Sequence, residues 1–214
     1  MNIEWLGRID YQSALRIQEE RLDSCLNDGK ETVILLEHEP VYTIGRLPDK
    51  SSLRVVAQLP YPLFETNRGG QATYHGPGQL VGYPILDLRQ RGRDLHCYLR
   101  NLEDLLIELL KEFDIQGEKV AGKTGVWVQD RKIASIGIGI RKWVTMHGFA
   151  LNVASDLSGF QSIVPCGLPG VRMTSISTEL ATEVSLEIVR EKLTPRLGKL
   201  SVLAPVSHRL PAEE

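Results

Sequence analysis

The sequence predicts a single α+β domain over residues 1–214, with a mixed, largely antiparallel sheet flanked by helices. Two observations predict the fold class: short β-branched, apolar runs are frequent, and a few long amphipathic segments interrupt them. A third concerns domain number. The chain has 214 residues, which suits one large or two small domains, but no linker, repeat or low-complexity tract divides it.

Three segments have the apolar spacing of helices. Asp10 can cap the first, which runs to about Asn27 and ends at Gly29. Asp94 opens the second, which contains LEDLLIELLKEF. The third is SLEIVREKLTPRLGKL, for which we expect a break or kink near Pro195, because proline cannot donate a helical hydrogen bond.

The remaining apolar runs predict strands, at 2–6, 32–38, 40–45, 79–88 and 149–154. The segments TGVWVQD and KIASIGIGI alternate on either side of Asp130-Arg131 and predict a hairpin. A loop containing Pro and Ser follows residue 45. Gly82 lies inside the predicted 79–88 strand, which indicates close approach of another group.

The composition excludes several classes of protein. Hydrophobic residues make up 42% and charged residues 24%, as in an ordinary globular domain. The net charge of -2 gives no field that would attract nucleic acid. No apolar run approaches the ~18 residues of a membrane span. The start, MNIEWLGRID, lacks the pattern of a signal peptide, so we expect a cytoplasmic protein without membrane or nucleic-acid partners.

The chain has three widely spaced cysteines, which argues against a disulfide framework. No C-x-x-C or H-E-x-x-H motif is present, so we expect no dedicated metal site. Cys25 and Cys97 lie in helical patterns, where cysteine is usually a small core residue. Cys166 lies in a loop between Pro165 and Gly167, and from this context a nucleophile and a buried loop cysteine are equally good interpretations.

Two glycine motifs resemble nucleotide-binding sequences. GEKVAGKT, at 117–124, fits every fixed position of the phosphate-binding G-x-x-x-x-G-K-[ST] loop. That loop must precede a helix, whereas the following GVWVQD is β-like. GIGI, at 137–140, lacks the third glycine and the helix of a dinucleotide fingerprint. We interpret both matches as coincidental.

A nucleophilic cysteine needs a partner that favours its thiolate or accepts its proton. His75, His147 and Lys132 are candidates by residue type, although Lys132 is also typical of a hairpin turn. The stretch TYHGPGQLVGYP, preceded by Arg68, Gly69 and Gly70, is by itself typical of a mobile surface loop. Its glycines would also let main chain approach a ligand closely.

Three blocks in order carry a family resemblance: RGGQATYHGPGQL, TGVWV…RKIASIGIGIRKWVTMHGFALNV and VPCGL. Together, from Arg68 to Leu168, they resemble the lipoyl(octanoyl) transferases of lipoate biosynthesis. The resemblance implies a fold like the biotin and lipoate protein ligases. It implies octanoyl transfer from the phosphopantetheine of octanoyl-acyl carrier protein to a lysine amine of lipoyl domains, those of 2-oxoacid dehydrogenases and the glycine cleavage H protein. It further implies a monomer that needs neither ATP nor metal.

The resemblance also assigns roles to residues. It makes Cys166 the acyl-thioester nucleophile and Lys132 its acid/base partner. Ala72 stands where a larger apolar residue is common and Leu168 where isoleucine is common, which would alter the pocket only slightly. The implied acyl pocket consists of Arg68, Gly69, Gly70, Gln71, Ala72, Thr73, Tyr74, His75, Ser135, Ile136, Gly137, Gly148, Phe149 and Ala150.

Two further expectations follow for the pocket. We expect the Gly69-Gly70 turn and the YHGPGQ loop to form its wall, with amides near Cys166 or His75 as an oxyanion hole. His75 and His147 then become structural pocket residues rather than bases.

Three alternatives remain beside octanoyl transfer. An ATP-dependent lipoate or biotin protein ligase would adenylate a free acid and would not need Cys166. A cysteine hydrolase would use Cys166 with His75 or His147 to hydrolyse acyl thioesters. A non-catalytic acyl-protein binding module would bind without turnover.

Basic residues suggest where an acidic carrier protein docks. LRQRGRD and the following RK pair provide Arg89, Arg91, Arg93, Arg141 and Lys142. Docking through some of these and an ordinary solvated basic loop are about equally good interpretations.

Overall fold

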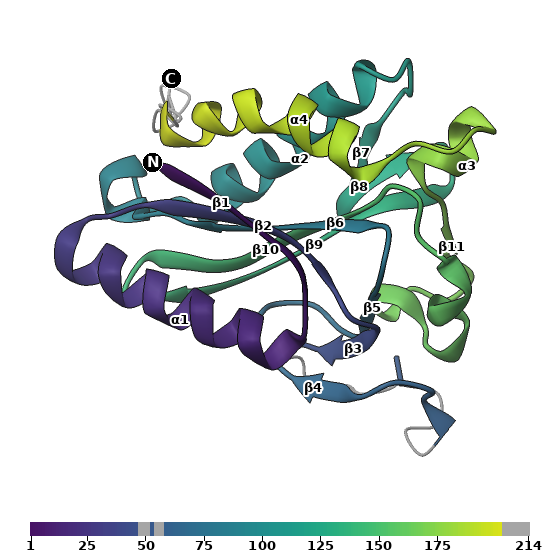
Figure 1. Cartoon of the computed structure of the whole chain (residues 1–214), viewed down its shortest axis with the longest axis horizontal. Coiled ribbons are helices and arrows are strands. Elements are labelled where there is room, and N and C mark those ends of the chain that lie inside the picture. The colour runs from purple at the N-terminus through teal and green to yellow at the C-terminus, as the bar shows by residue number, and fades with distance from the viewer. Residues whose placement is uncertain (47–51, 54–57, 203–214) are drawn as a thin grey trace, which may run out of the picture.

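The computed structural model describes residues 1–46, 52–53 and 58–202, so much of the loop predicted after residue 45 lies outside the described residues. A large sheet forms the middle layer, with one long helix on one face and two on the other (Figure 1). A smaller sheet lies beside the large one, next to the long N-terminal helix (Figure 1). This arrangement confirms the predicted α+β class.

The large sheet is mixed and largely antiparallel, as predicted. β1 pairs with β2 in parallel, and the other neighbours along the sheet pair antiparallel. The short strand β11 (Arg172–Met173) adds a parallel pairing to β9. The spatial order is β1 (Asn2–Ile9), β2 (Thr32–His38), β6 (Gln79–Ile85), β10 (Val144–Asn152), β9 (Arg131–Arg141), β8 (Lys123–Val128) and β7 (Glu118–Val120).

The small sheet positions the glycine-rich stretch. Its order is β4 (Leu63–Glu65), β3 (Val41–Ile44) and β5 (Thr73–His75). β5 is therefore the part of TYHGPGQLVGYP that forms a strand against β3, and β6 carries the rest into the large sheet. The stretch links the two sheets and is buried, which excludes the mobile surface loop.

The helices begin where the capping residues predict. The Asp10 side chain accepts the amide of Ser13 at the start of α1 (Tyr11–Asp28), which ends at the left-handed Gly29. Asp94 likewise caps α2 (Leu95–Lys111). α4 (Leu186–Leu197) runs through Pro195 and continues into a 3₁₀ turn, Gly198–Val202, so of the predicted break or kink the break is wrong. The proline falls in the last turn, where little helix remains to be disrupted.

The sheet divides the core into two layers. α2 and α4 pack on one face through residues such as Leu106 and Leu193. α1 packs on the other face through Leu22 and Cys25. Cys25 is thus the small core residue that the helical pattern predicted, whereas Cys97 is only half-buried.

The predicted strands differ from the structure mainly at their ends. The strand predicted at 79–88 ends at Ile85, because the Asp87 side chain caps a 3₁₀ helix, Leu88–Arg91. The strand predicted at 149–154 already begins at Val144, after a tight turn in which Lys142 and Trp143 both have positive φ. At Gly82 a Cβ would lie 2.1 Å from the Phe149 ring, which confirms the predicted close approach.

The two dismissed glycine motifs lie in strands. Residues 117–124 span β7 and the start of β8, which pair as an antiparallel hairpin without a helix. GIGI lies within β9. The predicted hairpin around Asp130-Arg131 is confirmed by the β8–β9 pairing.

Candidate active site

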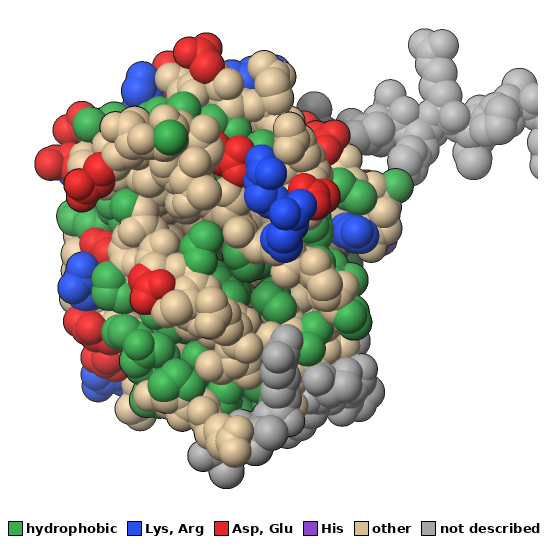
Figure 2. Space-filling view, turned by 90° about the vertical axis from the view of Figure 1, so that its right-hand side faces the viewer, with side chains coloured by type: hydrophobic (Ala, Val, Ile, Leu, Met, Phe, Trp, Pro, Cys, Tyr) green, Lys and Arg blue, Asp and Glu red, His purple; other side chains and the backbone are tan. Residues whose placement is uncertain are grey.

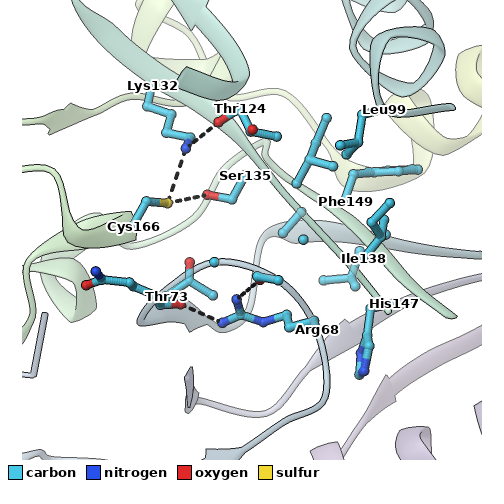
Figure 3. A pocket seen from close by; sticks show the side chains of 18 of the residues that line it. Arg68, Thr73, Leu99, Thr124, Lys132, Ser135, Ile138, His147, Phe149 and Cys166 are labelled. Carbon is cyan, nitrogen blue, oxygen red and sulfur yellow. Dashed lines mark hydrogen bonds between the residues drawn. The ribbon is translucent and has the colours of Figure 1, made fainter. Parts of the chain in front are cut away.

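A cavity of about 370 Å³ opens between the β9–β10 face, the Arg68–Gly70 turn and the loop that carries Cys166. Its size lies within the range of small-molecule sites. Lys132 and Ser135 point to Cys166 on one side, and Ile138, Phe149 and His147 lie across from them (Figure 3). The predicted pocket residues that line it are Arg68, Gly69, Gly70, Gln71, Thr73, His75, Ser135, Ile136, Gly137, Gly148, Phe149 and Ala150.

Lys132 and Cys166 meet at the edge of this cavity, as the resemblance implied. Lys132 Nζ lies 3.1 Å from Cys166 Sγ, and Ser135 Oγ lies 3.9 Å from the same sulfur. The two residues are 34 positions apart in the chain. β11 pairs beside the start of β9, with Met173 opposite Lys132, so it returns the chain to the lysine soon after Cys166.

The backbone of Cys166 is left-handed, with φ 56° and ψ 18°. A non-glycine residue in this region costs about 1–3 kcal/mol and persists only where its surroundings hold it. Here the Cys166 amide donates to the Ala72 carbonyl at 2.9 Å, and the Gly167 amide donates to the Val164 carbonyl at 3.0 Å. Both amides are therefore engaged within the protein, and the oxyanion hole predicted near Cys166 is not formed by either in this conformation.

The Lys132 side chain is buried, with 2% of the residue exposed, so it is not a turn lysine. Nζ donates to the Thr124 carbonyl at 2.8 Å and lies 5.3 Å from the centre of the Trp127 ring. Among the described residues, no carboxylate forms an ion pair with it. A lysine ammonium here would favour the thiolate of Cys166, since an opposite charge at this distance stabilises the charged form.

The two cavity histidines are neutral structural groups. Burial lowers the pKa of His75 and of His147 to about 3. The geometry places the His75 proton on Nδ1, which donates to Gln79 Oε1 at 2.7 Å, while His147 Nε2 donates to Asn67 Oδ1 at 2.6 Å. Neither ring is hydrogen-bonded to Cys166. Neither is therefore positioned as the base of a cysteine hydrolase.

Arg68 holds the glycine turn against the sheet. Its guanidinium is buried and donates to the carbonyls of Thr43, Gly69 and Gln71, and this burial lowers the pKa of the group. The Gly69 amide donates to the Ile138 carbonyl at 2.8 Å. A Cβ on Gly137 would lie 3.0 Å from the Gly69 carbonyl oxygen, so glycine there permits this close packing.

Part of the predicted wall lies elsewhere. Ala72 does not line the cavity, but its carbonyl holds the Cys166 amide. The Tyr74 ring packs against Phe160 in a separate cluster, because alternate β5 side chains face opposite sides. Residues 76–79, the rest of the YHGPGQ loop, are likewise not in the lining. At these positions the structure gives no support to a binding role.

Several lining residues were not predicted. Leu99 lies on the apolar face of α2, and Tyr11 opens α1, so neither differs from a core residue in sequence. Gly122, Lys123 and Thr124 come from the dismissed GEKVAGKT segment, which borders the cavity as a hairpin rather than as a phosphate loop. The other additions are Val81, Tyr83 and Ile138, whereas His147 and Leu168 line the cavity as expected.

The basic residues proposed for carrier docking are mostly engaged. Arg91 is buried and forms a bidentate pair with Glu31, with N–O distances of 2.5 and 2.7 Å. Arg89 pairs with Asp87, and Arg141 with Asp23. Arg141 and Lys132 stand at opposite ends of β9, about 30 Å apart at the rise of a strand. The prediction that Arg91 docks the carrier is wrong, because its side chain is buried and paired with Glu31.

The face that includes α3 (Ile176–Leu180) and β11 carries charges of both signs. Figure 2 shows hydrophobic side chains in the middle of this face and a group of Lys and Arg above them, with acidic side chains alongside. In this part of the chain Arg131 pairs with Glu179, and Arg172 pairs with Asp130. The basic side chains here are therefore partly neutralised by neighbours.

Among the residues that the structure describes, no cluster of three or more His, Cys, Asp or Glu is suited to hold a metal ion. None of the helices in the same residues has both the length and the apolarity needed to span a membrane.

The fold and the paired cysteine and lysine define a class of protein. The family model of the lipoyl protein ligase A/B catalytic domain matches residues 10–198, so the chain belongs to this family. Within it, the chain belongs with the octanoyltransferases. It is 49% identical to the octanoyltransferase of Citrifermentans bemidjiense over 91% of this chain and 94% of that one. It is 48% identical to that of Geobacter metallireducens over 92% and 91%.

Solved structures agree on the fold. A lipoate-protein ligase A bound with ATP superposes with a TM-score of 0.74 at 17% identity, covering 95% of this chain and 86% of that one. Biotin protein ligase from Aquifex aeolicus superposes with a TM-score of 0.55 at 15% identity, covering 94% and 69%. These likenesses confirm the biotin/lipoate protein ligase-like fold.

Proposed function

We propose that this protein transfers an octanoyl group from octanoyl-acyl carrier protein to a lysine amine of lipoyl domains, through a thioester on Cys166. The observation that carries the proposal is the 3.1 Å contact between Lys132 Nζ and Cys166 Sγ at the edge of a cavity. The octanoyl group and the transfer reaction are inferred from the relatives at 48–49% identity, which are named octanoyltransferases.

The two residues are suited to both halves of the transfer. The Cys166 thiolate attacks the thioester carbonyl, a bond forms from Sγ to the acyl carbon, and the bond to the carrier sulfur breaks. The Lys132 ammonium gives its proton to the departing thiolate. The incoming lysine amine then attacks the acyl carbon and passes a proton to neutral Lys132, while Cys166 leaves as thiolate. The second step restores the original ion pair of the Lys132–Cys166 dyad.

The cavity suits an acyl chain better than a nucleotide. Ile136, Ile138 and Phe149 provide apolar contact area, and Gly69 and Gly137 keep the walls close together. The GEKVAGKT segment forms a hairpin rather than the helix start of a P-loop. A thioester donor is already activated, so the proposed reaction uses neither ATP nor metal. The ligase that superposes on this chain was solved with ATP, which makes an ATP-dependent ligase the rival to exclude.

The remaining partners follow from this assignment. The acceptors are lipoyl domains, such as those of 2-oxoacid dehydrogenases and the glycine cleavage H protein, and the enzyme acts as a cytoplasmic monomer. Both macromolecular substrates must reach the Cys166 edge of the cavity. Arg141 is about 30 Å from that edge, at the other end of β9, so we do not assign carrier docking to it.

Intact-protein mass spectrometry tests the proposal directly. Wild type and Cys166→Ala are mixed with octanoyl-acyl carrier protein without ATP. We expect an octanoyl adduct on wild type alone, discharged when an unmodified lipoyl domain is added. Transfer by Cys166→Ala without an adduct would contradict the covalent route, and a strict need for ATP and free octanoate would favour the ligase. Release of free octanoate without an acceptor would favour the hydrolase, and carrier binding without turnover the binding module.

A further inference from the structure

Glu103 is a buried carboxylate on a helix face that is otherwise apolar. It lies in α2 between the core residues Leu102 and Leu105, and its side chain is 0% exposed. A carboxylate in such a place is costly unless hydrogen bonds and charges compensate it. The groups that bind the Glu103 carboxylate therefore indicate what the residue does.

The two carboxylate oxygens of Glu103 have different partners. Oε2 accepts from Arg100 Nη1 at 2.6 Å, one turn earlier on α2, where the arginine side chain is 45% exposed. Oε1 accepts from the backbone amide of Gly125 in β8 at 2.9 Å. One oxygen is thus bound near the surface, and the other holds a strand that borders the cavity.

The Gly125 amide belongs to the same peptide unit as the Thr124 carbonyl. That carbonyl accepts from Lys132 Nζ at 2.8 Å (Figure 3). A peptide unit is planar, so fixing its N–H also fixes the direction of its C=O. We propose that Glu103 is a positioning residue, which orients and polarises the Thr124–Gly125 peptide toward Lys132 and so supports its pairing with Cys166. This inference rests on the proposed role of the dyad.

The local backbone is fitted to this arrangement. Gly125 has φ +116°, a value that L side chains rarely adopt. A Cβ at this position would lie 2.7 Å from Lys132 Cε and 2.4 Å from the Ala134 carbonyl oxygen. The lysine stem therefore passes directly over the peptide that Glu103 holds.

Polarisation adds to orientation. A carboxylate that accepts from one end of a peptide strengthens the acceptor at the other end, and the effect is larger in a buried site. A more negative Thr124 carbonyl favours the ammonium of Lys132. Glu103 also places a negative charge near the pair, and a negative charge favours the protonated forms of neighbouring groups. Removing that charge while keeping the hydrogen bond should thus make the pair lose its first proton at lower pH.

Other charged and titratable groups also lie near Glu103 and the dyad. Arg100 faces Glu103 from the same helix, and Lys123 Nζ lies 5.0 Å from the centre of the Trp127 ring. The titratable groups that line the cavity with the dyad are Arg68, Lys123, His75, His147, Tyr11 and Tyr83. All of these groups are retained in Glu103→Gln, Glu103→Ala and Asp104→Asn.

The experiment compares Glu103→Gln with Asp104→Asn. Asp104 is the next residue on α2, and its side chain is 51% exposed and paired with Lys119. Each variant replaces one carboxylate by an isosteric amide. Only residue 103, however, is hydrogen-bonded to the Thr124–Gly125 peptide that holds Lys132. The readout is the rate of Cys166 alkylation by iodoacetamide between pH 5 and 10, followed by peptide mass spectrometry to separate Cys166 from Cys25 and Cys97.

We expect Glu103→Gln to shift the midpoint of the Cys166 profile by about half a pH unit or more toward lower pH. Asp104→Asn should leave it unmoved. An unmoved midpoint in Glu103→Gln, or an equal shift in both variants, overturns the inference. Because the glutamine is isosteric, thermal unfolding should show that the fold survives.

A second readout uses turnover. Glu103→Ala loses both charge and hydrogen bond, and we expect kcat to fall about tenfold or more with KM for the donor unchanged, since the acid/base group is misplaced. Glu103→Gln should rescue most of kcat, because an amide oxygen can still accept from Gly125. An equal loss of kcat in Glu103→Ala and Glu103→Gln, or a change in KM alone, would contradict a positioning role for Glu103. Alkylation needs no acyl donor, so a shifted profile without any octanoyl transfer would reject the proposed function and keep this inference.

Discussion

Two walls of the cavity differ in how their ionisable side chains are partnered. On the dyad wall, formed by Lys132, Cys166 and Thr124, the lysine has one carbonyl, one aromatic face and one thiol around it. On the histidine wall, formed by His75 and His147, each imidazole is bound to a side-chain amide. The dyad wall leaves a proton to be shared, whereas the histidine wall has each ring fixed in one neutral form. Proximity of a histidine to a cavity is therefore no measure of reactivity.

The histidine wall continues behind the cavity. Burial lowers the pKa of His38 to about 4, and its Nε2 lies 2.6 Å from the Tyr83 hydroxyl. Nδ1 of the same ring lies 3.3 Å from the Ile9 carbonyl and must donate to it, so the Tyr83 hydroxyl donates to Nε2. The polar groups of this region satisfy one another, and the comparison predicts that changes here alter stability rather than chemistry.

The largest expected effect is on the dyad wall. Lys132→Met should reduce the rate of acyl-enzyme formation about 10²- to 10⁴-fold, the usual contribution of a positioned acid/base group. His147→Gln should retain the rate within about tenfold, because the imidazole is not bonded to the sulfur. Rapid-quench mass spectrometry of the octanoyl adduct measures both. Equal losses in the two variants would break the distinction between the walls.

The second effect is a loss of stability in acid. His38, His75 and His147 are neutral in the folded protein, with pKa values lowered to about 4, 3 and 3, but they titrate near 6.5 when unfolded. Between these values the unfolded state binds more protons, so stability is full above about pH 6.5 and falls as pH decreases toward 4. Each histidine should contribute a loss of about 2 kcal/mol at pH 5.

Urea unfolding at pH 7 and pH 5 measures this loss. His38→Gln should reduce the difference between the two pH values by about 2 kcal/mol. His96→Gln is the matched control, because His96 is the second residue of α2 and is exposed, so the substitution should leave the difference unchanged. A wild-type stability that is equal at both pH values would mean that the histidine wall is hydrated and open to protons.

The parts of the fold and site that depend on local contacts could be predicted from the sequence, whereas the parts that depend on contacts between distant segments could not. Capping and periodicity placed Asp10, Gly29 and the helix faces, because these are local signals. The meeting of Lys132 with Cys166 depends on a parallel pairing between β11 and β9, which no local pattern encodes, and it was expected only from the family resemblance. In the sequence Glu103 is only one charged residue on an amphipathic helix. Its role could not be predicted, because its partner is a backbone amide in another element.

The residues wrongly placed show the same limit. Arg91 lies in a run of basic residues that is typical of an exposed loop, yet its guanidinium is buried against Glu31, 60 positions away. Tyr74 adjoins two cavity residues in sequence but faces the other side of a strand. Composition cannot distinguish a solvated arginine from a paired one, and a motif does not state which of its side chains face the ligand.

The smallest expected effect sharpens the comparison within the histidine wall. Tyr83→Phe removes the hydroxyl that donates to His38 Nε2 and leaves a buried acceptor unpaired, which should cost about 1–3 kcal/mol of stability. The ring itself stays, so the cavity keeps its shape, and alkylation of Cys166 should proceed at the wild-type rate within a factor of about three. Thermal unfolding and iodoacetamide kinetics on the same preparation provide the two values. A lower melting temperature with unchanged alkylation would place Tyr83 with the structural wall, whereas slower alkylation at unchanged stability would mean that the two walls are coupled through the cavity.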